Sequence, residues 1–296
     1  MRAFFWFLGL MAVALAAVAA LAWPAWTLLH PHFSFPFHRI AERLGMLALL
    51  LGFLLIARHL GLTDRKSLGY GLPRRLFIRE LSLALGLGVL TMLAVVALMA
   101  LLGLLEWRPD GAPAGVPRLV GSAALSGLAV AFIEETFLRG AMHTAVERES
   151  GTRLAVAATA LLYAATHFFA SFHIPAAQVT PLSGVALLGG TLQRFAHPLA
   201  ILDAFLALTA VGVALSLVRV ATGGIAACIG LHAGWVWVML TVHELTRPRE
   251  TAALGFLLSR FDGFVGWLAL AWTLLLIVPL WRFYAARGAR KPQFSC

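Results

Sequence analysis

Charged residues are scarce in this chain. They make up 12% of the sequence, whereas 61% of the residues are hydrophobic. Soluble globular proteins carry about 25% charged residues, and the mean hydropathy of this chain is +0.88. This composition excludes an ordinary soluble domain. It favours a protein that lies in a membrane.

Cysteine and acidic residues are also few. The two cysteines, Cys228 and Cys296, lie far apart and form no CxxC pair, which excludes a disulfide framework and a cysteine-based metal site. The 23 Lys and Arg residues outnumber the 13 Asp and Glu residues. They sit mainly between apolar runs and form no basic stripe with interleaved aromatics, so we expect no nucleic-acid partner.

Long apolar runs dominate what is present. A membrane-spanning helix needs about 20 apolar residues. The pattern therefore predicts an all-α fold, a polytopic membrane helical bundle of about eight transmembrane helices. We expect three parts: N-terminal helices with a basic loop over 1–118, a core over 119–242, and a last helix with a basic tail over 243–296. The expected spans are approximately 4–22, 44–57, 81–105, 119–146, 154–172, 199–218, 223–242 and 263–281.

The basic residues indicate an orientation for these spans. With the first residues inside, most Lys and Arg fall in cytoplasmic stretches, including the loop 58–79 and Arg219, as the positive-inside rule requires. We therefore expect both termini in the cytoplasm and a lipid bilayer around the spans. The first run also resembles a signal peptide, but its removal would leave an odd number of spans, so we expect it to be retained.

The most informative segment is Glu134-Glu135-Thr136-Phe137-Leu138-Arg139, inside the run 119–146. Each ionisable side chain costs roughly 2.5–3.5 kcal/mol at a bilayer centre, and such residues are functional by default. Glu135 and Arg139 are spaced i,i+4 and can pair on one helix face. Glu134 points about 100° away and needs a different partner.

Two intramembrane histidines lie at a matching depth. Glu134 and His167 are about equally far from the turn near Ser150, and His232 lies at a similar level in the seventh run. We expect Glu134, His167 and His232 to converge. A carboxylate with two imidazoles in a dry pocket suits the activation of water. The same three groups are also a known zinc set, but the sequence contains no HExxH motif, so we expect no metal and no cofactor.

These residues resemble the CPBP family of intramembrane endopeptidases, which includes the CAAX prenyl proteases and bacterial Abi-type proteins. The EExxxR motif matches residues 134–139 in full, and Tyr163-Ala164-Ala165-Thr166-His167 matches FxxxH with Tyr in place of Phe. The third motif, HxxxN or HxxxD, matches only at His232, because position 236 is Val. The resemblance covers residues 119–242 and favours a bacterial cytoplasmic membrane.

The resemblance implies a role for each matching residue. Glu134 would activate water together with His167, His232 would stabilise the oxyanion, and Glu135 and Arg139 would support the site. Val236 removes the side chain that usually assists the oxyanion, and we hypothesise that an indole N–H of Trp235 or Trp237 replaces it. We expect Tyr163 to pack in the core with its hydroxyl bonded to a neighbour.

The sequence therefore favours a glutamic-type intramembrane endopeptidase that hydrolyses a membrane-associated or lipidated protein or peptide. Two other functions remain open: a proton-coupled transporter that uses the buried Glu and His, and a non-catalytic scaffold held by a structural ion-pair cluster. Serine and aspartyl intramembrane proteases are disfavoured, because Ser126-Gly127 and Asp203 lack the flanking residues of those motifs.

Overall fold

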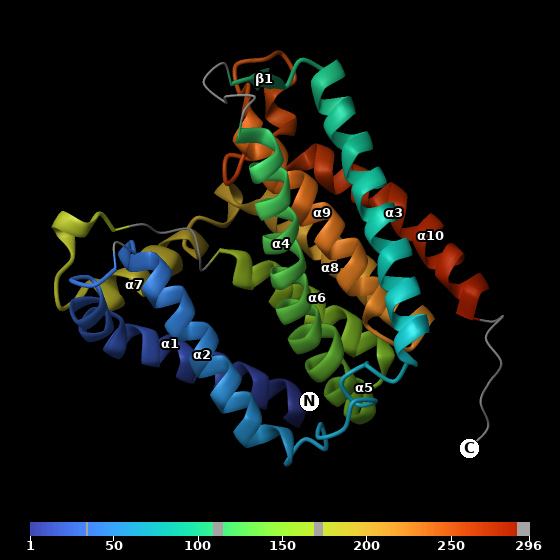
Figure 1. The fold of residues 1–296 in the computed structure, drawn as a ribbon, viewed down its shortest axis with the longest axis horizontal. Coiled ribbons are helices and arrows are strands. Elements are labelled where there is room, and N and C mark those ends of the chain that lie inside the picture. The colour runs from blue at the N-terminus through green and yellow to red at the C-terminus, as the bar shows by residue number, and fades with distance from the viewer. Residues whose placement is uncertain (34, 109–114, 169–173, 289–296) are drawn as a thin grey trace.

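The computed structural model describes residues 1–33, 35–108, 115–168 and 174–288, and these are mainly helical (Figure 1). The all-α class is therefore confirmed. The helices are α1 (Arg2–Leu29), α2 (Phe37–Ala57), α3 (Arg74–Leu101), α4 (Val116–Glu135), α5 (His143–Ser150), α6 (Thr152–His167), α7 (Ser183–Phe195), α8 (Leu202–Thr222), α9 (Ala226–Leu245) and α10 (Trp267–Gly288). Short 3-10 turns occupy Ala176–Gln178, Pro198–Ala200 and Gly255–Leu257, and the π-helical segment η2 covers Thr136–Met142.

Seven helical stretches in the described part of the chain are long and apolar enough to cross a membrane. They correspond to seven of the eight expected spans. The remaining expected span, 154–172, contains α6, which has 16 residues and ends at His167. Residues 169–173, like Cys296 at the end of the chain, lie outside the described residues.

Three local features differ from the expected pattern. Helix α2 begins at Phe37 instead of near residue 44 and therefore contains Arg39 and Arg43. Helix α7 occupies part of an expected outer loop. Strands β1 (Leu105–Trp107) and β2 (Thr246–Pro248) form an antiparallel pair. These short pieces carry too few residues for a clear apolar period, so hydropathy did not indicate them.

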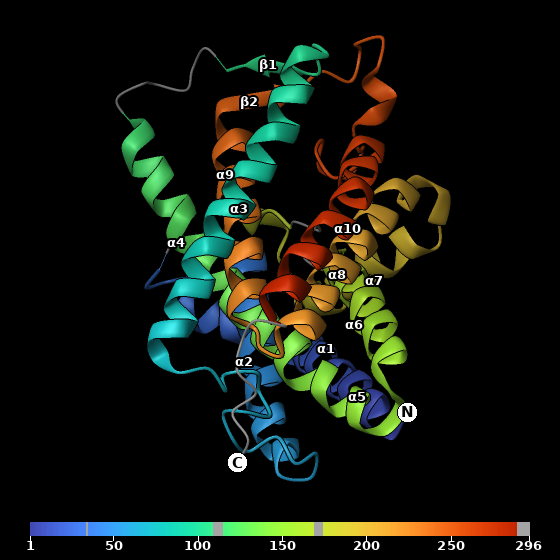
Figure 2. The same cartoon turned by 90° about the vertical axis from the view of Figure 1, so that its right-hand side faces the viewer.

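Helix α9 lies at the centre of the bundle. It packs against α3 and α4, while α8 packs against α6 and α10 (Figure 2). The α3–α9 contact depends on glycine: a Cβ on Gly88 would lie 2.5 Å from the carbonyl oxygen of Leu231, and one on Gly234 would lie 2.6 Å from that of Leu85. Small residues let membrane helices approach this closely. The close approach positions the helix that carries His232.

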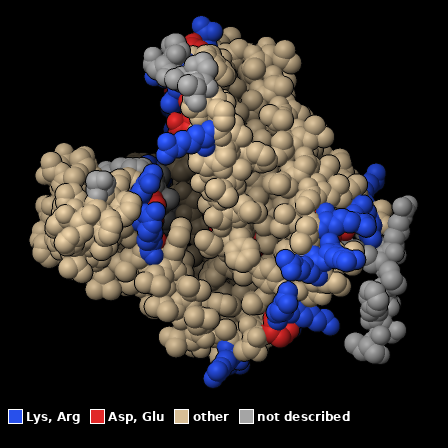
Figure 3. Space-filling model, in the orientation of Figure 1, with Lys and Arg blue, Asp and Glu red and all other residues tan. Residues whose placement is uncertain are grey.

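Helices α1, α2 and α7 form a second group beside this bundle (Figure 1). Glu149 at the end of α5 ties α1 to the bundle, because its carboxylate accepts the backbone N–H groups of Arg2 at 2.6 Å and Ala3 at 2.7 Å. Figure 3 shows a hollow in the surface between this second group and the rest of the molecule.

The outer surface suits a hydrocarbon environment. Leu55, Leu101, Leu125 and Leu275 are each more than 70% exposed on the candidate spans, and most of the face in Figure 3 carries no charged side chain. Apolar exposure on this scale is unusual for a soluble protein. The protein is therefore an integral membrane protein.

Candidate active site

The two glutamates of the motif lie at the C-terminal end of α4, where the helix changes its winding. Residues Thr136–Met142 form η2, in which the N–H of His143 bonds to the carbonyl of Leu138, five residues back. Gly140 in this segment packs against the loop before α3, and a Cβ there would lie 2.6 Å from the carbonyl oxygen of Leu68. Single π-helical turns often occur at functional sites.

Glu135 is the charge centre of the site. Its side chain is fully buried, and its Oε1 lies 2.9 Å from the Arg139 guanidinium, as the i,i+4 spacing predicts. The same oxygen lies 2.8 Å from Nδ1 of His232 on α9. This second contact differs from the expected arrangement, in which His232 lies with Glu134. The result is a three-residue cluster centred on Glu135.

Arg139 links this cluster to α8 and is itself fully buried. Its guanidinium donates to the carbonyl oxygen of Gly212 at 3.2 Å. The backbone carbonyl of Arg139 in turn accepts a bond at 3.1 Å from Arg219, which also reaches the hydroxyl of Thr144. Arg219 lies in the last turn of α8 and is only 8% exposed, so it belongs to the packing around η2.

Glu134 lies in a different environment from its neighbour. The residue is half-buried, and its Oε2 is buried without a hydrogen-bond partner among the described residues. The two residues before it, Phe132 and Ile133, are about half exposed, so this part of α4 is open on one side. A buried carboxylate oxygen without a partner is costly, and such atoms call for a functional explanation.

Both histidines of the site have one nitrogen held and the other available. Nδ1 of His167 lies 2.8 Å from the carbonyl oxygen of Tyr163, one turn earlier on α6. Because a carbonyl only accepts, this Nδ1 carries the proton and Nε2 of the neutral ring holds a lone pair. The carboxylate of Glu135 selects the same tautomer of neutral His232.

Tyr163 lies between these groups. The centroid of its ring is 4.4 Å from that of His167 and 5.8 Å from that of His232, and the Arg139 guanidinium carbon lies 4.7 Å above the ring. Two of the three residues expected to converge, His167 and His232, therefore contact the same aromatic ring.

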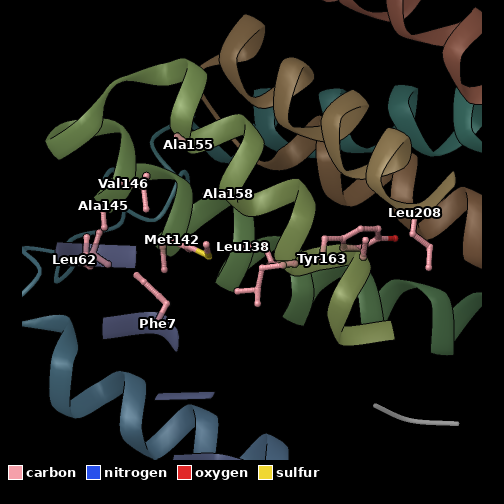
Figure 4. Close-up of a cluster of buried hydrophobic side chains, with 14 of the residues drawn as sticks. Phe7, Leu62, Leu138, Met142, Ala145, Val146, Ala155, Ala158, Tyr163 and Leu208 are labelled. Carbon is pink, nitrogen blue, oxygen red and sulfur yellow. The ribbon is translucent and has the colours of Figure 1, made fainter. Parts of the chain in front are cut away.

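The surroundings of this ring are apolar. Tyr163 belongs to a buried cluster that joins α1, η2, α5, α6 and α8, and Figure 4 shows its ring extending from α6 toward Leu208. The hydroxyl forms no hydrogen bond with any described residue, although the sequence predicts one. The expectation of a bonded tyrosine was therefore wrong for the described part of the chain.

The indole N–H groups of the two tryptophans near position 236 donate hydrogen bonds to other residues. The indole N–H of Trp235 donates to the hydroxyl of Thr91 at 2.9 Å, and that of Trp237 donates to the carbonyl of Val120 at 3.0 Å. Neither is available to replace the missing side chain at Val236, so this hypothesis is not supported. No three His, Cys, Asp or Glu side chains of the described residues form a group that would hold a metal.

Two further polar residues lie near the site that the sequence analysis did not single out. Tyr70, from the loop before α3, hydrogen bonds through its hydroxyl to Thr136, the residue that follows Glu135. His143 is fully buried at the start of α5, and its nearest acidic contact is Glu147 at 3.8 Å. The Tyr70 bond depends on packing between distant segments, which no local motif reveals. His143 is an ionisable residue inside the apolar run 119–146, and that position is itself a signal in the sequence.

Together these features define a polytopic helical membrane protein with a buried polar site made by α4, η2, α6, α8 and α9. Residues 117–238 match the family model described as type II CAAX prenyl endopeptidase, Rce1-like. This segment contains the EExxxR motif, His167 and His232, and the match confirms the resemblance to the CAAX protease family. No curated protein and no solved structure matches the chain. The family supports an intramembrane protease activity, a hydrolase that acts on a peptide or protein at the membrane.

Proposed function

We propose that this protein is a glutamic-type intramembrane endopeptidase in which Glu134 and His167 activate the attacking water. One observation carries the proposal: two adjacent glutamates have opposite environments. Glu135 is fully buried and its Oε1 bonds to Arg139 and His232, whereas Glu134 is half-buried and forms no ion pair with any described residue. In both residues Oε2 is buried without a hydrogen-bond partner. Two carboxylates in contrasting environments are typical of divided roles in catalysis.

The reaction proceeds without a covalent intermediate. Water attacks the scissile carbonyl carbon and gives its proton to the carboxylate of Glu134. Nε2 of His167 accepts the second hydrogen bond of the water, because its Nδ1 is held by the carbonyl of Tyr163. The proton on Glu134 then passes to the leaving amine as the C–N bond breaks, which restores the carboxylate.

The other motif residues hold this arrangement. Glu135 binds Nδ1 of His232, so that Nε2 is directed away from it and, in the protonated ring, donates a hydrogen bond to the oxyanion. Arg139 compensates the charge of Glu135 and anchors it to α8 through Gly212. Glu135 and Arg139 are thus positioning residues.

The substrate is a membrane-associated or lipidated protein or peptide. The half-exposed side chains of Phe132 and Ile133 next to Glu134, and the hollow beside the second helix group in Figure 3, support access from within the membrane.

Two contacts hold the two ends of the chain, which lie on the same side of the helical bundle (Figure 2). Glu149 binds the start of α1, and Arg287 of α10 lies 3.2 Å from Glu80 near the start of α3. This side also carries the basic loop 58–79. These features support our proposal that both termini lie in the cytoplasm, and the family resemblance favours a bacterial cell.

The test begins with the termini of membrane proteins compared between a wild-type strain and a Glu134→Gln strain. A cleavage product found only in the wild type identifies a substrate for assay in proteoliposomes. Glu134→Gln and His167→Ala should each lower kcat by about 10²–10⁴-fold, with insertion unchanged. Cleavage by Glu134→Gln at the wild-type rate would refute the proposal. Proton-coupled flux through liposomes without any cleavage would favour a transporter.

A further inference from the structure

The hydroxyl of Tyr163 is the polar group of the site that still lacks a role. The residue is 3% exposed, and its hydroxyl makes no hydrogen bond with any described residue. The family motif has Phe at this position, so packing alone does not require an oxygen atom here. The Tyr163 oxygen is not among the fully enclosed polar atoms of the described residues, and a phenol hydroxyl without a protein partner is free to donate a hydrogen bond to a bound group.

The proposed hydrolysis requires donors for the oxyanion, and the other neutral donors nearby are occupied. The indole N–H groups of Trp235 and Trp237 bond to Thr91 and Val120. Val236, one turn after His232, offers no polar atom. Nε2 of His232 donates only when the ring is protonated. The Tyr163 hydroxyl is a donor in its neutral form.

The geometry around Tyr163 places this donor at the site. Its ring contacts the rings of His167 and His232 at 4.4 and 5.8 Å. Glu135, the neighbour of Glu134, bonds to both His232 and Arg139 beside this ring. The Arg139 guanidinium lies over the ring face at 4.7 Å and limits its movement. A donor held rigidly before the reaction stabilises developing charge most effectively.

We propose that Tyr163 is a catalytic residue whose hydroxyl donates a hydrogen bond to the oxyanion formed when water attacks the substrate carbonyl. This role rests on the proposed endopeptidase function. It involves no proton transfer: the phenol keeps its hydrogen, and the negative charge on the oxyanion returns to the carbonyl when the C–N bond breaks. In this chain, Tyr163 supplies the donor that Val236 does not.

The test uses Tyr163→Phe in the full-length protein in proteoliposomes. The substrate is the one found by comparing membrane-protein termini between the wild-type and Glu134→Gln strains. This change keeps the ring, its contact with Arg139 and its packing against both histidines, and removes only the hydroxyl. Loss of one oxyanion donor lowers kcat by about 10²–10³-fold. We expect that loss with KM, the thermal midpoint and the shape of the pH–rate profile unchanged. Tyr284→Phe is the matched control, because it also removes a buried hydroxyl, on α10, and it should retain wild-type kcat.

A second variant tests rescue. Asn at position 236 places an amide donor one turn from His232 on the same face of α9. We therefore expect Tyr163→Phe combined with Val236→Asn to recover at least tenfold in kcat over Tyr163→Phe alone. Wild-type kcat in Tyr163→Phe overturns the proposal, as does a rise in KM with kcat unchanged. Glu134→Gln distinguishes failure of the endopeptidase proposal from failure of the Tyr163 proposal. If Glu134→Gln retains activity, the proposed endopeptidase function is wrong. If Glu134→Gln is inactive while Tyr163→Phe is fully active, only the role of Tyr163 is wrong.

Discussion

Nδ1 of His232 lies 2.8 Å from Oε1 of Glu135, the same carboxylate oxygen that pairs with Arg139. The second histidine of the site is therefore bound to the second glutamate of the motif, and the first glutamate keeps its own carboxylate available. This relationship separates two chemically identical neighbours into a positioning residue and a candidate base. It also makes the two glutamates matched controls for each other.

Glu135→Gln should destabilise the protein, and Glu134→Gln should not. Loss of the Glu135 charge leaves Arg139 fully buried without its counter-charge, and breaking a buried ion pair costs about 3–5 kcal/mol. Glu134 forms no ion pair with any described residue, so Glu134→Gln leaves no buried charge without its partner. Thermal unfolding in detergent measures the difference in stability between the two variants. Equal unfolding midpoints would contradict the conclusion that Glu135, and not Glu134, compensates the charge of Arg139.

Gly88→Ala should separate α3 from α9 and lower both stability and activity. The new Cβ would lie 2.5 Å from the carbonyl oxygen of Leu231, next to His232, and such overpacking costs about 1–3 kcal/mol. Gly86 on the same helix has nothing within 4 Å of its Cβ position. Gly86→Ala should therefore leave the unfolding midpoint and the cleavage rate unchanged, and a loss in both variants would disprove the packing argument.

Tyr70→Phe should lower stability by about 1 kcal/mol, the typical value of one hydrogen bond. The change removes the bond between the loop before α3 and Thr136, next to Glu135, so a decrease in activity should accompany it. Tyr284→Phe removes a hydroxyl that is buried without a partner in the described structure and should be neutral or stabilising. Unfolding midpoints of the two variants provide the comparison; an equal loss would argue against the Tyr70–Thr136 bond.

Asp262, in the loop before α10, should make stability depend on pH. Burial raises the pKa of this carboxyl above its ordinary value of 3.8, while hydrogen bonds from the backbone N–H groups of Val265 and Phe264 partly oppose the shift. A raised folded-state pKa contributes stability at low pH that is lost as the pH rises through that value. Asp262→Asn keeps the accepting oxygen and should remove this loss.

Unfolding midpoints measured from pH 4 to pH 8 test the effect. The wild type should lose stability relative to Asp262→Asn as the pH rises. Parallel curves for the two proteins would show that Asp262 ionises in the folded state as it does in the unfolded chain.

Much of the fold follows from local sequence. Apolar runs of about 20 residues predict membrane helices wherever they occur, because each helix satisfies its own backbone hydrogen bonds. The pairing of Glu135 with Arg139 is predictable for the same reason, since i,i+4 neighbours share a face whatever surrounds the helix. Local patterns did not indicate α7 or the β1–β2 pair.

The partners of the site residues required the tertiary structure. The sequence predicts a similar membrane depth for Glu134, His167 and His232. A similar depth does not determine which of these side chains contact one another. His232 and Glu135 are 97 residues apart, and Arg219 reaches η2 from 80 residues away. Such contacts depend on the rotation and separation of packed helices, which the close α3–α9 approach sets.

The sequence by itself determined that this is a helical membrane protein with charges inside the bilayer, because hydropathy and helical spacing are properties of short segments. Only the tertiary structure decided that His232 binds Glu135, that Glu134 keeps a free oxygen, and that Tyr163 lies between the histidines. Those relationships arise from packing between distant helices, where a turn of one helix by a single residue brings a different side chain to the site.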